Sequence, residues 1–590
     1  MTLYATPPPP SQWQTILKRP FARLVRHCLD RIFYGGDAAQ EDELDLGIGV
    51  ALGLLALPGV LVSFFLIDKY GSLFQVILGI KDFDPYAASM PDEYFFIALS
   101  MVVTASIAIW KWDSLLPDRR DYANLAPLPI RNRTFFAANL LALTFLTAIM
   151  SLDVNAASMV AFPLVVTGSR SSFSYYAVFL AAHVTSLLLA SLFSFLVVLA
   201  ILGVLMSVLP YRVFRKSSLY VRLGIVTFLL AILSTSFAVP PILQKLSPLA
   251  HSPLRFLPPV WFVALNQSML GRANPALASL RGVALAATGT ALVVAIGAYA
   301  FSYRRAFIRS AEIMESLPAG GGVIAPRIFR LLDRLVFRTP FERASFRFTM
   351  KALARSDSQA LVLGWFAGLG IVIASQTLFA ALNARPHEIN HVPAAAILSI
   401  PLTLGYFLIT GLRCAFDVPV ALRANWLFRV TVDPDTHQCA PLVRKIMFLF
   451  LLPALILICF PVYAHFRGGQ LALIHTAMVG MMYLLLIEIF LMSFRKIPFT
   501  CSMPAFKSHS IATVVILIIG FFVFSTLTST AEQWALEDPF RFVLFIPLVP
   551  AAAFAISRWR QGMIHLDKKI IFEDKLAPAI EVAMNLDFGR

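Results

Sequence analysis

FSYRRAFIRSAEIMESLPAGGGVIAPRIFRLLDRLVFRTPFERASFRFTMKALARSDS, residues 301 to 358, is an arginine-rich stretch near the middle of an otherwise very apolar chain of 590 residues. It holds ten arginines and one lysine. Apolar runs of membrane-spanning length precede it and follow it, and we count six on each side. The stretch therefore predicts a basic connector that joins two membrane halves.

The composition excludes a soluble protein with one large core. Hydrophobic residues make up 58% of the chain and charged residues 14%, whereas soluble domains carry roughly 25% charged residues. Apolar stretches of about 20 residues are typical of helices that cross a bilayer. The net charge of +16 reports orientation in such a protein, so the expected partner is the lipid bilayer, and no nucleic acid is expected.

The sequence predicts an all-α polytopic integral membrane protein with about twelve transmembrane helices in two six-helix halves. The expected spans of the first half are Leu46–Ile67, Tyr94–Trp110, Phe135–Leu152, Tyr175–Leu209, Val221–Val239 and Val283–Phe301. Those of the second half are Gln359–Leu382, Val392–Leu412, Ile446–Ala464, Leu471–Phe494, Ile511–Leu527 and Phe542–Ile556. The stretch Tyr175–Leu209 would reach about 52 Å as one helix. An extra span between it and the preceding apolar stretch is the alternative.

The distribution of basic residues predicts that both termini are cytosolic. With the N-terminus inside, the inner segments hold 39 of the 49 Lys and Arg residues, in keeping with the positive-inside rule. Six spans per half give both halves the same orientation, so they form a parallel repeat. The expected segments are a cytosolic N-terminus (1–45), a first membrane half (46–301), a connector (302–358), a second membrane half (359–557) and a cytosolic tail (558–590).

An amphipathic stretch precedes the first span of each half. Trp13–Phe33 and Phe341–Arg355 both place apolar residues at helical spacing with basic residues between them. This pattern is typical of a helix that lies among lipid headgroups, and packing on a cytosolic partner is the alternative for the first of them. Pro20 predicts a kink there.

Two loops of the first half carry Pro-led turns. The inner loop Lys111–Thr134 reads KWDSLLPDRRDYANLAPLPIRNRT and predicts a short surface helix between two spans. The outer segment Pro240–Arg281 contains the run LPPVWFVAL, in which Pro258 and Pro259 precede Trp261.

In these features the chain resembles the membrane-spanning permease subunits of bacterial ABC type-2 exporters. The resemblance implies a coupling helix in the inner loop, where a separate ATPase subunit docks, and short re-entrant helices in the outer segment. It also implies a multi-pass protein of the cytoplasmic (inner) membrane. The candidate coupling residues are Asp118, Arg119, Arg120, Asp121, Tyr122, Pro127 and Pro129. The chain contains no Gly-Lys pair and therefore no P-loop, so no cofactor is expected in it, ATP belongs to the partner, and the chain itself is not expected to be an enzyme.

Glu488 lies in the tenth predicted span and His183 in the fourth, and both are candidates for an intramembrane polar site. Such residues are costly there and are functional candidates. We interpret the absence of other charges as an argument against a proton-coupled or ion-coupled carrier. It favours a cargo that is amphipathic or lipid-like.

Three alternatives remain open at this point. A major-facilitator-type carrier also has two six-span halves, but Asp118-Arg119-Arg120 matches only a fragment of its inner-loop motif. His387-Glu388-His391 satisfies the H-E-x-x-H pattern of zinc peptidases, but Pro393 disturbs the helix which that pattern needs. A non-transporting membrane scaffold needs no motif at all.

Overall fold

The computed structural model describes most of the chain, and every regular element in the described residues is helical. The described residues are 20–34, 62–63, 66–67, 85–112, 115, 132–167, 173–245, 253–271, 275–312, 336–383, 395–419, 425–431, 439–492, 494, 496–500 and 510–564. The chain forms two compact units, which we call unit 1 (residues 1–221 and 231–318) and unit 2 (residues 222–230 and 319–590).

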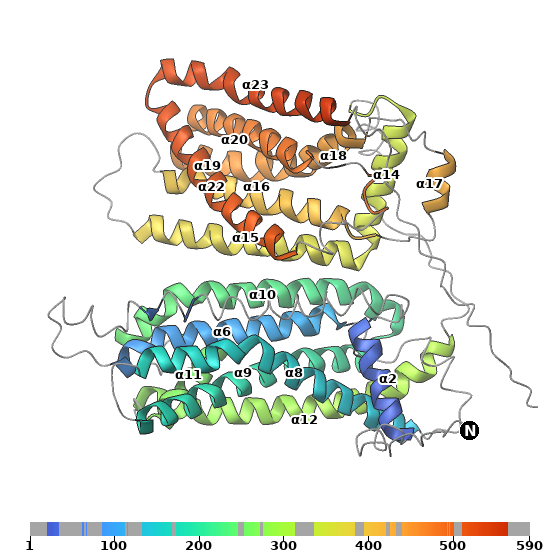
Figure 1. Cartoon of the computed structure of the whole chain (residues 1–590), viewed down its shortest axis with the longest axis vertical. Helices are drawn as coiled ribbons and strands as arrows, with labels where there is room; N and C mark the ends of the chain where they lie inside the picture. Colours follow the sequence, from blue (N-terminus) through green and yellow to red (C-terminus); the bar gives the residue numbers. More distant parts are fainter. Residues whose placement is uncertain are drawn as a thin grey trace, which may run out of the picture. The chain divides into compact units, whose positions relative to one another are not determined.

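Unit 1 is built around one long helix, α9 (Phe173–Val208), which packs against α6, α8, α11 and α12 (Figure 1). Its other elements are α2 (Pro20–Tyr34), α6 (Pro85–Trp110), α8 (Asn132–Thr167), α10 (Tyr211–Lys245), η3 (Pro253–Phe256), α11 (Pro258–Met269) and α12 (Pro275–Glu312). Residues 222–230 of α10 group with unit 2.

The long apolar stretch at 175–209 forms a single helix. α9 is 36 residues long and contains no proline. The preceding apolar residues belong to α8, which is also 36 residues long and carries Pro163 within its last turns. The interpretation as one long helix is therefore correct, and the structure has no extra span at this point.

Unit 2 is organised around α16 (Ala395–Phe416), which packs against α15, α18, α20 and α22. The remaining elements are α14 (Pro340–Arg355), α15 (Asp357–Asn383), α17 (Asn425–Thr431), α18 (Cys439–Ala454), η7 (Leu455–Cys459), α19 (Phe460–Arg467), α20 (Gly469–Phe490), α22 (Ser510–Leu536) and α23 (Pro539–Ile564). The segment α18–η7–α19 forms one span that is interrupted by a π-helical turn between Pro453 and Pro461. Pro461 has no N–H to donate to the preceding turn, which accounts for the break.

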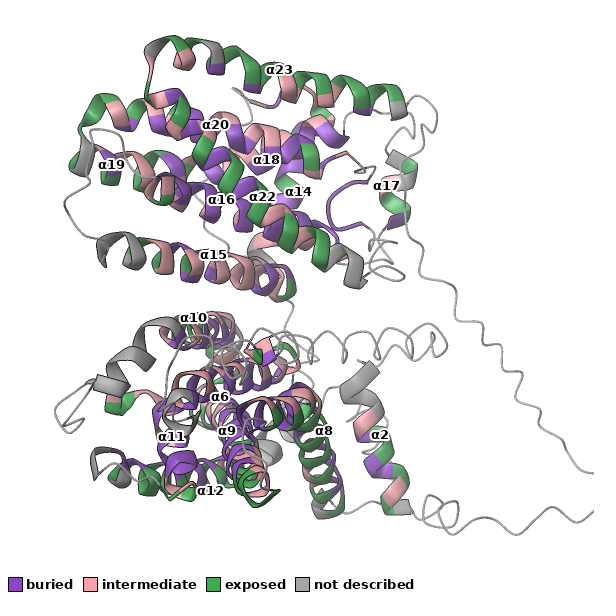
Figure 2. Cartoon of the chain, turned by 60° about the vertical axis from the view of Figure 1, so that its left-hand side comes forward, coloured by how far each residue is buried: buried purple, intermediate pink, exposed green. Residues whose placement is uncertain are grey.

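The described residues contain 11 helices that are long and apolar enough to cross a membrane. They correspond to 11 of the expected spans, and the remaining one, Leu46–Ile67, lies almost wholly outside the described residues. Helices α12 and α23 are largely exposed along their apolar length (Figure 2), as expected of helices that face lipid. The multi-pass, all-helical architecture is thus confirmed, and the sides on which the termini lie stay a prediction.

Several helices extend further than the hydropathy of the sequence indicates, and two of these extensions, in α6 and α22, change the placement of a glutamate. α6 begins at Pro85, whereas the expected span began at Tyr94. α22 ends at Leu536, whereas the expected span ended at Leu527. Glu93 and Glu532, which the sequence assigned to outer segments, therefore lie inside helices, and both are buried.

The amphipathic helix α2 packs on protein through its apolar face. Leu24, Val25 and Cys28 are buried, and α2 contacts α8. The kink predicted at Pro20 stays a prediction, because α2 is described only from that residue onward. Residues 13–19 lie outside the described part of the chain.

Helix α14 confirms the predicted amphipathic helix before the second half. The hydroxyl of Thr339 accepts a hydrogen bond from the backbone N–H of Glu342 at 3.2 Å and caps the helix. The Glu342 carboxylate accepts one from the backbone N–H of Arg338 at 2.8 Å and one from Lys445 of α18 at 2.6 Å. This carboxylate ties α14 to the bundle.

The ion pair of Glu342 predicts that acid loosens α14. Burial raises the pKa of this carboxyl. The hydrogen bonds from Lys445 and from the Arg338 backbone, together with the Lys445 charge, have a larger effect in the other direction. The pKa of Glu342 is therefore lower than that of an ordinary glutamate. Stability from the pair is therefore present above the ordinary glutamate pKa and is lost as the pH falls through the lowered one. We expect amide hydrogen exchange in α14 to rise over that acidic range. In Glu342→Gln it should already be raised at neutral pH and change little with acid. An equal pH response in both proteins would contradict this.

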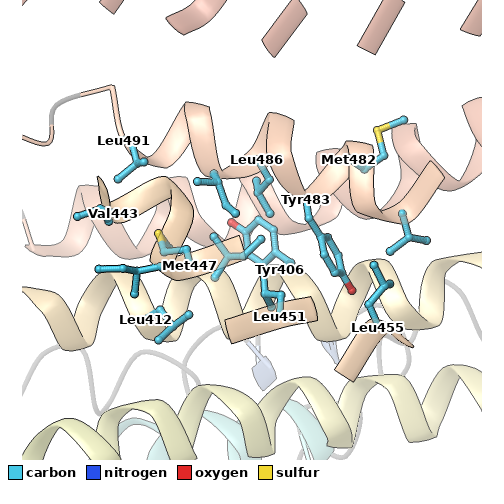
Figure 3. Close-up of a cluster of buried hydrophobic side chains, with 14 of the residues drawn as sticks. Tyr406, Leu412, Val443, Met447, Leu451, Leu455, Met482, Tyr483, Leu486 and Leu491 are labelled. Carbon is cyan, nitrogen blue, oxygen red and sulfur yellow. The ribbon is translucent and has the colours of Figure 1, made fainter. Parts of the chain in front are cut away.

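The core of unit 2 contains the ring of Tyr483, which Figure 3 shows among other buried side chains. Here α16 approaches α20 closely. Gly405 of α16 faces this ring, and a Cβ at that glycine would lie 2.0 Å from a ring carbon. The ring cannot retreat easily, because the Tyr483 hydroxyl donates to the carbonyl of Pro401 at 2.6 Å within the core. Only a residue without a side chain fits there.

We expect Gly405→Ala to lower the free energy of unfolding by about 1–3 kcal/mol, the usual cost of overpacking a core. Unfolding by sodium dodecyl sulfate in mixed micelles measures it. Gly289→Ala in α12 is the matched control, since no atom lies within 4 Å of a Cβ there. A loss no larger in Gly405→Ala than in Gly289→Ala would show that the two helices do not meet as described.

Candidate functional site

The outer turn predicted around Pro258, Pro259 and Trp261 forms a short buried helix. α11 begins at Pro258, where a missing N–H costs nothing, and the Trp261 indole donates to the carbonyl of Arg255 at 2.6 Å. From Pro259 to Gln267 every residue except Trp261 is buried. The helix packs against α6, α9 and α12, so the segment between α10 and α12 enters the bundle.

A buried carboxylate ties α11 to two spanning helices. Glu93 Oε1 of α6 lies 2.8 Å from Nδ1 of His183 on α9 and accepts a hydrogen bond of 2.7 Å from Nδ2 of Asn266 on α11. Glu93 and His183 are 0% exposed and Asn266 is 1% exposed. The predicted intramembrane residue His183 is thus one half of a His–Glu pair.

The His183 ring lies among aromatic side chains. The ring centroids of Phe162, Phe96 and Phe179 lie 5.1, 5.9 and 6.3 Å from that of the imidazole. Within the described residues, four buried polar atoms at this site have no hydrogen-bond partner: Glu93 Oε2, His183 Nε2, Asn266 Oδ1 and Gln267 Nε2. Buried polar groups are nearly always hydrogen-bonded, so unpaired atoms next to a buried ion pair mark a functional candidate.

Unit 2 contains a second pair of the same kind. His475 Nδ1 on α20 lies 2.6 Å from Glu532 Oε1 on α22, and the two side chains are 0% and 3% exposed. The ring of Tyr463 on α19 lies against the imidazole, with 4.3 Å between centroids. His475 Nε2 has no hydrogen-bond partner among the described residues. Each unit therefore holds one buried His–Glu pair beside aromatic rings.

Each pair lies near one end of its own bundle. His183 is ten residues past the first residue of α9, and Glu93 is eight past the first residue of α6. His475 is six residues past the start of α20, and Glu532 is four before the end of α22. At the helical rise of about 1.5 Å per residue, the four side chains lie about 6–15 Å inside their helix ends, within the apolar windows.

Glu488, the other predicted intramembrane residue, bridges two arginines within unit 2. Its Oε1 accepts from Arg444 of α18 at 2.7 Å, and its Oε2 accepts from Arg560 of α23 at 2.6 Å. Glu488 and Arg560 are both 2% exposed as side chains. This arrangement links three helices at the end of the bundle where α14 lies (Figure 1). The structure does not join Glu488 to His183, which belongs to unit 1.

Several predicted sites lie outside the described residues. The candidate coupling residues from Asp118 to Pro129 fall within 116–131, and His387-Glu388-His391 falls within 384–394. Among the described residues there is no group of three His, Cys, Asp or Glu side chains that could hold a metal ion.

Sequence reasoning missed Glu93, His475 and Glu532 as site residues. The two glutamates each interrupt an apolar run near a helix end, and a hydropathy window stops at the first carboxylate. Trp534-Ala535-Leu536 after Gln533 gave a signal that the helix continues past Glu532, whereas Pro91, directly before Asp92-Glu93, argued against a helix that begins at Pro85. The spans still hold few charges, but Glu93 and Glu532 belong to them, which weakens the argument against a proton-coupled carrier.

Comparisons of the chain with protein-family models, with curated proteins and with solved structures found no match.

Proposed function

We propose that this protein is the membrane-spanning permease subunit of an exporter whose ATPase is a separate polypeptide. The observation that supports this most is α11, a short helix between two spans that enters the bundle. The type-2 exporters that the chain resembles are expected to have a re-entrant element at this place.

The physical argument concerns backbone polar groups. A chain that turns within the depth of a bilayer must bury its free N–H and C=O groups in protein or expose them to a water-filled cavity. A membrane scaffold that transports nothing does not need such a turn. In a permease, a short helix held by Glu93 and Asn266 shapes one end of the path that the cargo takes.

The partner follows from the loop Lys111–Thr134, which joins α6 to α8. Its Pro-bounded charged cluster suits a docking surface at the cytosolic face, and we place the protein in a bacterial cytoplasmic membrane. The cargo that fits the largely apolar helices is amphipathic or lipid-like.

Charge reversal in this loop tests the proposal. We expect Arg119→Glu/Arg120→Glu to reduce the amount of ATPase subunit that co-elutes with the purified protein at least several-fold, because both arginines belong to the proposed docking surface. Quantitative mass spectrometry of the eluate measures it. Arg541→Glu, which reverses an exposed arginine in the first turn of α23, is the control and should leave co-elution unchanged. Equal co-elution from all three proteins would contradict docking at this loop.

A self-contained carrier is the second candidate function. The buried Glu93–His183 and His475–Glu532 pairs favour it, because carriers driven by ion gradients keep ionisable groups inside their bundles. This candidate predicts that cargo moves in vesicles which contain this protein alone and no ATP.

A further inference from the structure

We propose that the Glu93–His183 and His475–Glu532 pairs are proton-binding sites, one in each unit, and that this protein couples the movement of its cargo to protons bound and released there. The proposal goes beyond the exporter function and does not depend on it, since an ATP-driven permease and a carrier could both use such sites.

The chemistry of each pair supports one exchangeable proton. A histidine and a glutamate that share one proton are neutral together, as imidazolium with carboxylate or as imidazole with carboxylic acid. Loss of that proton to water leaves a net charge of −1 on the pair, and uptake of another from water leaves +1. An unbalanced charge is costly in a low-dielectric interior, so a closed unit holds one proton per pair. A unit that admits water can exchange it.

Each pair keeps at least one nitrogen or oxygen atom that can bind a further proton. Glu93 Oε2, His183 Nε2 and His475 Nε2 have no hydrogen-bond partner among the described residues, so a proton added at any of them displaces no existing contact. Aromatic rings surround His183, and the Tyr463 ring lies against His475, so each imidazole borders a largely apolar wall on these sides. In the ion pair of Glu488, by contrast, both carboxylate oxygens accept a hydrogen bond from an arginine, as expected of a purely structural pair.

A pair of buried hydroxyl side chains lies two helical turns further into each bundle. In unit 1, Ser100 is seven residues past Glu93 on α6, and its Oγ lies 2.5 Å from Ser191 Oγ of α9. Asn155 of α8 donates to Ser191 at 3.1 Å. Seven residues correspond to about 10 Å along the helix, on the same face as the carboxylate.

Unit 2 repeats this spacing with different residues. Ser525 is seven residues before Glu532 on α22, and its Oγ lies 3.4 Å from Thr403 Oγ1 of α16. Because α22 runs toward the end at which Glu532 lies, Ser525 is on the inner side of its carboxylate, as Ser100 is in unit 1. Hydroxyl groups both donate and accept, so each carboxylate is followed inward by a group that can relay a proton.

The other titratable groups nearby come from the helices packed against each pair. In unit 1, those in the same half of the helices are Asp92, Tyr94, Asp153, Tyr175, Tyr176 and Arg281. In unit 2 they are Cys459, Tyr463, His465, Glu537, Asp538 and Arg541. The Tyr463 ring contacts His475, and the charge of Glu532 acts on Cys459. Variants of the two glutamates are therefore needed to separate proton exchange at the pairs from the titration of these neighbours.

Infrared difference spectroscopy of the full chain in lipid vesicles tests the proposal without ATPase or cargo. The spectra compare about pH 4 with about pH 9, which brackets the ordinary pKa values of glutamate and histidine. We expect the wild type to show a protonated-carboxyl band that changes with pH and shifts on ¹³C-glutamate labelling. The band is read after transfer to D₂O, where carboxyl groups that resist exchange belong to buried side chains. Glu93→Gln/Glu532→Gln should lose at least half of this exchange-resistant part. Glu537→Gln, which removes an exposed glutamate one turn past the second pair, should leave it unchanged.

A second measurement needs no substitution and covers the case in which the double variant does not fold. In histidine-labelled wild type transferred to D₂O, imidazole bands that resist exchange belong to buried rings, and these should change over the same pH range as the carboxyl band. Spectra of Glu93→Gln/Glu532→Gln that superimpose on those of the wild type would overturn the proposal. Protected imidazole bands that do not change with pH would overturn it as well. Because neither readout involves ATP, this failure would be distinct from failure of the exporter function.

Discussion

We expect Glu488→Leu to lower the free energy of unfolding of unit 2 by about 3–5 kcal/mol, which is typical when one partner of a buried ion pair is removed. The Arg560 side chain is 2% exposed and would be left as a buried charge without its carboxylate. Arg444 would lose the same partner but is 36% exposed, so water can replace it. Unfolding in mixed micelles at graded sodium dodecyl sulfate measures the loss.

The matched control for this prediction is another Glu–Arg pair. Glu537 accepts from Arg541 at 3.4 Å, and both side chains are more than a third exposed. We expect Glu537→Leu to cost no more than about 1 kcal/mol, as for most exposed pairs. If the two variants were equally stable, Arg560 would not be buried against Glu488 as described.

Glu93→Leu is expected to have the next largest effect and to act on α11. The change leaves Asn266 Nδ2 without its acceptor and His183 Nδ1 without its hydrogen-bond partner, and each buried polar group orphaned in this way costs about 1–3 kcal/mol. Because Asn266 is the residue through which α11 reaches Glu93, the loss should appear as faster amide hydrogen exchange in α11, together with lower overall stability.

A double-mutant cycle makes this prediction specific. The double variant Glu93→Leu/Asn266→Leu removes donor and acceptor together, so it should cost less than the sum of the single variants by about 0.5–3 kcal/mol. Glu93→Gln keeps an acceptor oxygen and should leave α11 exchange close to that of the wild type. Strict additivity in the cycle would mean that the Glu93–Asn266 hydrogen bond does not hold α11.

The sequence predicted the helices well because apolar runs of bilayer length have few alternatives. A stretch such as Phe173–Val208 must satisfy its backbone groups internally, and a helix is the only way to do so within one segment. The amphipathic helix α14 was equally predictable, since its apolar period and its Thr339-Pro340 start are local properties of the sequence.

The sites were harder to predict because they depend on contacts between distant residues. Glu93 meets His183 across 90 positions and His475 meets Glu532 across 57. A single sequence shows that burying an ionisable residue in the membrane costs free energy, but it does not show which distant residue pairs with it and offsets that cost. For the same reason Glu488 was identified as a lone carboxylate, although Arg444 and Arg560 flank it in the bundle.

Composition analysis of the protein purified in mild detergent from its native host tests the central proposal most directly. Mass spectrometry of a crosslinked and a non-crosslinked sample would identify and quantify what co-elutes. The account predicts a separate ATPase subunit with a P-loop in fixed stoichiometry to this chain, lost on reversing Arg119 and Arg120. A chain that elutes alone under both conditions, and moves cargo in vesicles without ATP, would contradict the exporter function and establish a self-contained carrier.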